Sequence, residues 1–255
     1  MSQHTIIVAG VDVAKDALDL AFLPGDCHRL SNDKRGIARL IELVREKQAQ
    51  HVVFEATGPF HRPLAEALAA AGTAFPAVNP ARARRFPEAT GTLAKTDRID
   101  ALGLARMGTA LTLAPTHLPS PARQRLKDLI AARRSLAADH TANANRLATE
   151  RDPLCQRYTR ARLKQLGRQS AGLEREIAAI VKGDETLRRD ATRLATIPGI
   201  GLLTAATLLA EMPELGTMTG REAAMLAGLA PVANDSGRRK GPRSIRGGRA
   251  ALRQA

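Results

Sequence analysis

The stretch Ile6-Ile7-Val8-Ala9-Gly10-Val11-Asp12-Val13 decides the fold expected for this chain. It is an apolar run rich in β-branched residues, which predicts a buried strand, and the carboxylate of Asp12 interrupts it. A second run, Val52-Val53-Phe54-Glu55, also ends in a carboxylate. A carboxylate buried alone loses its hydration at a large cost in free energy. Such groups are expected to have a salt-bridge partner, a raised pKa or a metal ion.

Strands and helices alternate around these runs, from residue 5 to about residue 115. This alternation predicts an α/β domain with a mixed or parallel sheet. The periodicity predicts helices at 34–48 and 64–71, and strands at 5–13, 17–23, 51–55 and 73–78, the last closed by Asn79-Pro80.

Two further carboxylates, Asp97 and Asp100, lie three residues apart, a spacing that places both on one face of a helix. Together with Asp12 and Glu55 they would repel one another unless divalent cations lay between them. Two Mg²⁺ ions held by such oxygen ligands suit an in-line attack on a phosphodiester. Each carboxylate taken singly has a plainer interpretation, as a satisfied strand residue or part of a solvated helix face.

The charge of the chain favours a polyanionic partner. Its 39 Lys and Arg residues against 25 Asp and Glu residues give a net charge of +14. Aromatic residues make up only 2% of the chain, so base stacking on single strands is poorly supported and phosphate contacts with duplex or structured nucleic acid are favoured. The alternative is a basic enzyme with a solvated charged face.

No segment of the sequence approaches the length of a membrane span, and the N-terminus does not resemble a secretory signal. The two cysteines, Cys27 and Cys155, form neither a metal motif nor a disulfide framework. These features predict a cytoplasmic protein without a membrane partner.

Long helices are predicted at 121–150 and 155–182, after the N-cap signal Ser120-Pro121. The second has apolar positions spaced by four and three residues, which is typical of a coiled coil. The segment is expected to form an antiparallel helical hairpin or an oligomerisation arm, or else two ordinary helices packed on a globular body.

The turn Ile197-Pro198-Gly199-Ile200-Gly201 leads into another helix and resembles a helix-hairpin-helix element. Backbone N–H groups at such a helix start suit a phosphate, so Gly199 and Gly201 are candidate DNA contacts, unless this is a plain tight turn. The basic segment 234–249 is expected to be a mobile loop that presents the Ser236 hydroxyl to a phosphate, or a disordered tail. The candidate phosphate-binding cations are Lys95, Arg238, Arg239, Lys240 and Arg243.

The chain resembles the DEDD transposases of bacterial insertion sequences, the RuvC-like group that includes Piv-type DNA invertases and bridge-RNA-guided recombinases. The resemblance rests on motifs in the family's order along nearly the whole chain. They are Gly10-Val11-Asp12-Val13-Ala14-Lys15, Glu55-Ala56-Thr57-Gly58, Asn79-Pro80, 95–101 around the Asp97/Asp100 pair, 197–201, Ala227-Gly228-Leu229-Ala230-Pro231 and Asp235-Ser236-Gly237.

The resemblance implies a ribonuclease-H-like catalytic domain at 1–115, a coiled-coil arm at 116–190 and a small, mostly α C-terminal domain at 191–255. It implies Ser236 as a nucleophile that forms a covalent 5′-phosphoserine, a structured guide RNA, donor and target DNA, and dimers or tetramers. The rival hydroxyls are Ser244, better suited to capping or phosphate contact, and Tyr158, better suited to packing.

Family members generally continue with further helices after the Gly-Gly-Arg region, so this sequence is expected to be a compact member or a truncated copy. Two alternatives to a serine recombinase follow. One is a RuvC-like nuclease or junction resolvase that uses metal-activated water. The other is an inactive nucleic-acid-binding remnant of a mobile element.

Overall fold

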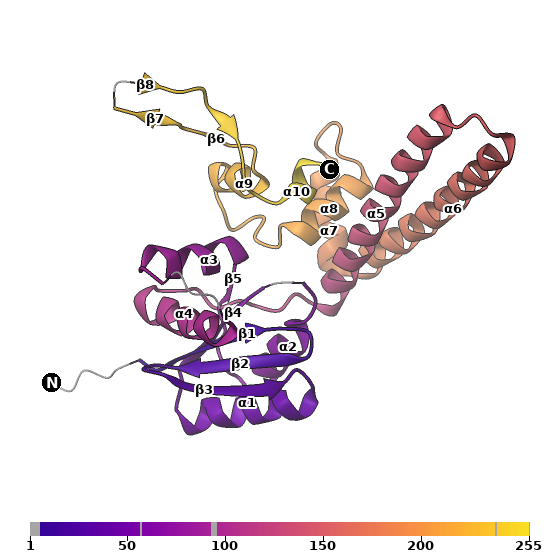
Figure 1. Ribbon diagram of the computed structural model, residues 1–255. Helices are drawn as coiled ribbons and strands as arrows, with labels where there is room; N and C mark the ends of the chain where they lie inside the picture. Colours follow the sequence, from indigo (N-terminus) through magenta and orange to yellow (C-terminus); the bar gives the residue numbers. More distant parts are fainter. Residues whose placement is uncertain (1–5, 57, 93–95, 238, 255) are drawn as a thin grey trace. The chain divides into compact units, whose positions relative to one another are not determined.

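The computed structural model describes residues 6–56, 58–92, 96–237 and 239–254. The chain forms two compact units, Met1–Leu118 and Pro119–Ala255 (Figure 1). Each unit has its own apolar core. Within the described ranges, no helix combines the length and the apolar character that a membrane span needs.

The first unit is built on a five-stranded mixed sheet with the order β3-β2-β1-β4-β5. The first three strands of the chain pair antiparallel, whereas β4 lies parallel to β1 and β5 lies parallel to β4. The strands are β1 Val8–Val13, β2 Ala17–Phe22, β3 Asp26–Ser31, β4 His51–Glu55 and β5 Ala77–Val78. The predicted α/β class with a mixed sheet is therefore confirmed.

Helices cover both faces of this sheet (Figure 1). On one face α1 (Lys34–Glu46) and α2 (Arg62–Ala70) pack against alternate residues of β1 and β4, such as Val11 and Phe54. On the other face α3 (Pro80–Ala89) and α4 (Asp97–Ala110) pack against the intervening residues, such as Val8 and Val53. The alternation of a strand thus sends successive side chains into two different cores.

Two elements of the first unit were missed in the sequence. Strand β3 has the polar sequence Asp-Cys-His-Arg-Leu-Ser, because it is an edge strand with a partly exposed face. Helix α3 starts where only a strand end was expected: the Asn79 side chain accepts a hydrogen bond from the Ala81 N–H (2.9 Å), and Pro80 occupies the first helical position. The predicted strand 73–78 is shorter, with regular pairing at Ala77–Val78.

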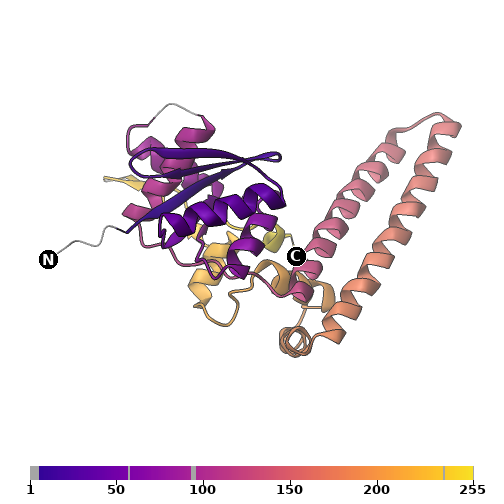
Figure 2. The ribbon, with the colours of Figure 1, turned by 90° about the horizontal axis from the view of Figure 1, so that it is seen from below.

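The second unit begins with two long antiparallel helices, α5 (Pro121–Thr149) and α6 (Pro153–Gly183). They run side by side in both views (Figures 1 and 2). Ion pairs Arg133–Glu174 (2.7 Å) and Arg125–Glu176 (2.9 Å) join them. The pairing forms a helical hairpin; its function as a coiled-coil arm stays a prediction.

The base of this hairpin shares one core with the two helices that follow, α7 (Glu185–Ala195) and α8 (Leu202–Glu211). Ile130 and Ile177 from the hairpin contribute to the same cluster as Leu187 and Leu209. The predicted division at 190/191 falls within α7. A separate arm and C-terminal domain therefore stay a proposal.

The chain then forms α9 (Gly220–Ala227) and a set of short strands that end in α10 (Ala250–Arg253). The strands pair as β6 with β9 and β7 with β8, with bounds Pro231–Val232, Asp235–Ser236, Arg239–Lys240 and Ser244–Ile245. The segment expected as a mobile loop or disordered tail is therefore a β-hairpin on a two-stranded base.

Candidate functional site

The end of β1 and the end of β4 bring two of the predicted carboxylates to the same sheet edge. The parallel register pairs Val11 with Phe54, so Asp12 and Glu55 are the next residues on neighbouring strands. Val8 and Val53 pack under α4, and the two-residue period of each strand places both carboxylates on that same face.

Helix α4 delivers the other two carboxylates to this face. Thr96 caps the helix by accepting a hydrogen bond from the Ile99 N–H (3.2 Å), which puts Asp97 and Asp100 in the first turn. The positive end of the helix dipole favours carboxylates there. Gly10 lets the helix approach closely, since a Cβ on Gly10 would collide with the backbone of Ala101 and Ala105.

The pKa of Asp12 is a sign of this convergence. It is raised from 3.8 to about 6, first by burial and then by the negative charges of Asp100, Asp97, Asp19 and Glu55. The other three predicted carboxylates thus lie within electrostatic reach of Asp12, and their negative charge opposes its ionisation.

A fifth carboxylate, Asp19, was not singled out from the sequence. It lies directly opposite Asp12 in the antiparallel register of β1 and β2, and it is 9% exposed. The pKa of Asp19 is raised above its usual value, because the effect of burial exceeds the opposing effect of the nearby Arg29 guanidinium. The alternation Ala17-Leu18-Asp19-Leu20 held the signal, because it places Asp19 on the face opposite the apolar core.

The donor set fits a hard divalent cation. Carboxylate oxygens are the ligands that Mg²⁺ prefers, and a bound cation would offset the repulsion that raises the Asp12 pKa. Among the described residues, no group of three or more Asp, Glu, His or Cys side chains is arranged so that it could hold a metal ion. The structure brings the carboxylates to one face of the sheet, where β1 and β4 end and α4 begins. Their function as a metal-binding tetrad stays a prediction.

Ser236 belongs to the second unit, at the tip of the β7–β8 hairpin. It is exposed and pairs with Arg239 across the turn, where Gly237 adopts a positive φ of 55°. Ser244, the rival hydroxyl, lies on β9 opposite Val232. The geometry presents Ser236 at a hairpin tip, and its chemical role stays a prediction.

An ion pair holds the segment that follows β9. The Arg249 guanidinium donates to both carboxylate oxygens of Glu214, at 2.8 and 2.7 Å, and to the carbonyl of Glu211. This pairing lowers the pKa of Glu214 and raises that of Arg249. Arg249 thereby ties the segment after β9 to the end of α8.

The predicted phosphate contacts divide into those the structure places and those it does not. Arg239 and Lys240 are exposed on β8, and Arg243 is exposed just before β9. Lys95 and Arg238 lie outside the described residues.

In the turn before α8, Gly199 has a positive φ of 90° and Gly201 is the N-cap of the helix. A Cβ on either glycine would meet open space. The turn is therefore accessible from the side of the helix N-terminus.

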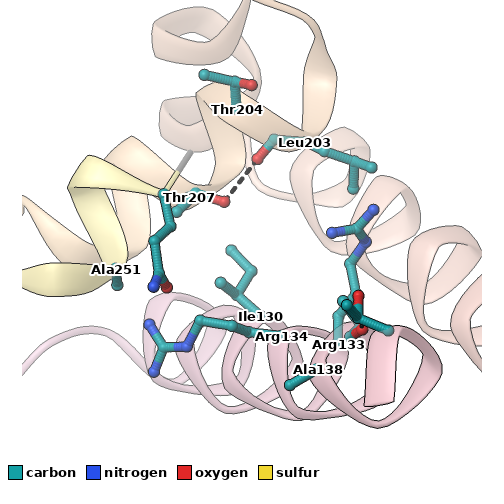
Figure 3. Close-up of a pocket in the computed structure, with 11 residues that line it drawn as sticks. Ile130, Arg133, Arg134, Ala138, Leu203, Thr204, Thr207 and Ala251 are labelled. Atoms are coloured by element: carbon teal, nitrogen blue, oxygen red, sulfur yellow. Dashed lines mark hydrogen bonds between the residues drawn. The ribbon is translucent and has the colours of Figure 1, made fainter. Parts of the chain in front are cut away.

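A separate cavity of about 530 Å³ lies between α5, α8 and α10 (Figure 3). Arg133 and Arg134 line one side, and Thr204 and Thr207 line the other; Thr207 donates a hydrogen bond to the Leu203 carbonyl (2.8 Å). None of the residues predicted from the sequence lines this cavity.

Comparisons with known proteins identify the family of the chain. A family described as transposase matches residues 9–149, and a family described as transposase of the IS116/IS110/IS902 family matches residues 191–255. The pilin gene-inverting proteins of Moraxella bovis and Moraxella lacunata are each 26% identical over 240 residues, which cover 89% of this chain and 73% of each relative. The carboxylates lie within the first match and Ser236 within the second.

Proposed function

Since this chain belongs to the IS110 family of DEDD transposases, we propose that it cuts and rejoins DNA through a covalent link between Ser236 and a 5′ phosphate. The chain is a DNA transposase or recombinase, and membership in its family implies dependence on a divalent metal ion. The covalent chemistry, the choice of Mg²⁺ and the guide RNA are the proposed parts.

The observation that supports the proposal is that Asp12 and Glu55 lie on the sheet face covered by α4, whose first turn carries Asp97 and Asp100, and that the pKa of Asp12 is raised to about 6. We assign these four residues to hold two Mg²⁺ ions. When bound, such ions neutralise charge on a scissile phosphate and on the attacking and leaving oxygens.

The Ser236 hydroxyl oxygen would attack the scissile phosphorus, forming a phosphoserine ester while the bond to the 3′ oxygen breaks. The product would be a protein-linked 5′ end and a free 3′-OH. Attack by a new 3′-OH would reverse the step and join different ends, so the phosphodiester energy is conserved without hydrolysis. An exposed serine at a hairpin tip suits this role, because a DNA backbone can approach it.

Cationic residues surround this serine and suit the DNA backbone. Arg239, Lys240 and Arg243 lie in the same short segment, and the open turn at Gly199 and Gly201 offers a helix N-terminus to a phosphate. We assign these cations and the two glycines of the turn to phosphate contacts, together with Lys95 and Arg238.

The distal part of the α5–α6 hairpin is a further basic surface. Arg157 and Tyr158 are exposed and stacked, with the guanidinium carbon 5.5 Å from the ring centre. Arg160, Arg162 and Lys164 follow on α6. We propose that this region serves a structured guide RNA, and that the hairpin supports a dimer or tetramer.

A nuclease that uses water is the second candidate, because all four carboxylates lie in the first unit and need no residue of the second to gather. A RuvC-like resolvase of this kind would release free 5′ phosphates without a protein link.

The test of the shared metal chemistry is strand cleavage of DNA carrying the element's own junction, with Mg²⁺ and any flanking transcript. Glu55→Gln and Asp100→Asn should each abolish cleavage and leave DNA affinity largely intact. Asp16→Asn, which alters an exposed carboxylate in the β1–β2 turn, is the matched control and should cleave normally. Near-normal cleavage by both tetrad variants would overturn the assignment.

A further inference from the structure

A single guanidinium nitrogen links the acidic cluster to a residue outside the predicted tetrad. Nη1 of Arg29 lies 3.3 Å from Oδ2 of Asp97 and 3.4–3.5 Å from the two carboxylate oxygens of Asp19. The three residues come from different elements: Asp19 from β2, Arg29 from β3 and Asp97 from the first turn of α4.

The strand registers explain why these groups meet. Asp19 is paired with Arg29 across β2 and β3, and with Asp12 across β1 and β2. Directly paired residues project from the same face of a sheet, so the three form a row on the face that α4 covers. Opposed carboxylates such as Asp12 and Asp19 repel each other. Arg29 supplies the compensating charge at the far end of the row.

The two carboxylates joined by Arg29 differ in their surroundings. Asp19 is 9% exposed, and its Oδ2 accepts no hydrogen bond from any described residue. The Asp97 side chain is 53% exposed. A buried strand residue is held in place by packing, whereas an exposed side chain at a helix start can rotate unless a partner restrains it. Among the described residues, Arg29 is a partner that restrains Asp97.

We propose that Asp19 and Arg29 are positioning residues for metal binding: Asp19 anchors Arg29, and Arg29 holds the Asp97 carboxylate beside Asp12. The inference rests on the proposed function, in which Asp97 is a metal ligand. Neither Asp19 nor Arg29 needs to touch the metal or the DNA. Partners of this kind orient a ligand before the metal arrives, and their loss weakens metal affinity.

The test measures Mn²⁺ binding by the full chain without nucleic acid. The electron paramagnetic resonance signal of free Mn²⁺ is the readout. Arg29→Gln should raise the Kd about tenfold, the lower end of the range for such partners. Arg29→Lys keeps the charge and should recover part of the loss. Arg39→Gln, which breaks ion pairs on α1 at a distance from the cluster, is the matched control and should bind normally.

A double variant separates anchoring from direct ligation. If Asp19 acts through Arg29, Asp19→Asn combined with Arg29→Gln should bind Mn²⁺ about as well as Arg29→Gln alone. If instead the Kd of the double variant rises by the product of the two single-variant factors, Asp19 acts as an independent ligand and the proposal is overturned. Thermal unfolding without metal checks that each variant folds; Arg29 is 64% exposed, which favours this.

Two results distinguish this inference from the function on which it rests. If Asp97→Asn weakens Mn²⁺ binding while Arg29→Gln leaves it unchanged or tightens it, the positioning proposal is wrong and the metal site stands. If Asp97→Asn leaves Mn²⁺ binding unchanged, both the metal assignment and the positioning proposal are wrong.

Discussion

Replacing Asp12 with Asn should stabilise the metal-free chain while destroying its activity. The folded state holds the Asp12 proton with a pKa of about 6, against 3.8 for an ordinary aspartate. At pH values below about 4 the carboxyl is protonated in both states and contributes no penalty. As the pH rises from about 4 to about 6, the unfolded chain ionises first, so the folded state loses stability. Above about pH 6 the full penalty is present.

The size of the effect follows from the shift. A difference of about two pH units at about 1.36 kcal/mol each gives an upper bound of about 3 kcal/mol. Asp12 is only partly buried, and solvent screening reduces this to about 1–2 kcal/mol. Asn has nearly the same shape and no charge. The variant should therefore be more stable than the native chain at pH 7.5 by that amount, and equal to it near pH 4.

Differential scanning calorimetry in a chelating buffer is the assay, with Asp16→Asn as the exposed control that should change little. Adding Mg²⁺ should stabilise the native chain more than the Asp12→Asn variant, because a ligand stabilises the state that binds it. Equal stability of the native chain and the variant at pH 7.5 without metal would refute the reasoning that Asp12 is ionised at a cost within an acidic cluster.

Three further predictions concern the parts that hold the site. Gly10→Ala should destabilise the first unit by about 3 kcal/mol, because its Cβ would meet the α4 backbone, whereas Gly25→Ala, with open space around it, should change the unfolding free energy by less than about 0.5 kcal/mol. Comparable denaturation midpoints for the two would argue against the close β1–α4 approach. Arg249→Met should lower the unfolding free energy of the second unit by about 1 kcal/mol, since Glu214 loses a bidentate partner that is itself partly exposed. An unchanged unfolding temperature in calorimetry would contradict this prediction. Replacing Arg239, Lys240 and Arg243 with Gln should flatten the dependence of log K on log salt for duplex DNA by up to about one unit per lost phosphate contact, and an unchanged slope would remove the hairpin from the DNA interface.

The sequence predicted the part of the site that depends on strand period and helix start. The apolar runs that contain Asp12 and Glu55 and the Asp97/Asp100 spacing indicated strands and a helix start, because those features are local. Asp19 was missed because its importance depends on the antiparallel register that pairs it with Asp12 and Arg29. That register includes β3, which is too polar to be recognised as a strand.

The region around Ser236 was harder to predict for a similar reason. The glycine-containing basic segment 234–249 predicted a mobile loop or a disordered tail, yet two-residue strands pair on each side of the turn at Gly237. Such short strands have too few residues to show alternation, and β6 pairs with β9, which lies more than ten residues farther along the chain. Contacts between distant segments are what sequence periodicity does not record.

The central claim, that Ser236 becomes covalently attached to DNA, is tested most directly by a denaturing gel of end-labelled junction DNA incubated with the chain and Mg²⁺. The account predicts a slowly migrating, protease-sensitive band that is lost in Ser236→Ala and kept in Ser244→Ala. Cleavage without such a band would contradict the account and identify a nuclease that uses water. A band that persists in Ser236→Ala would contradict it equally, by placing the nucleophile elsewhere.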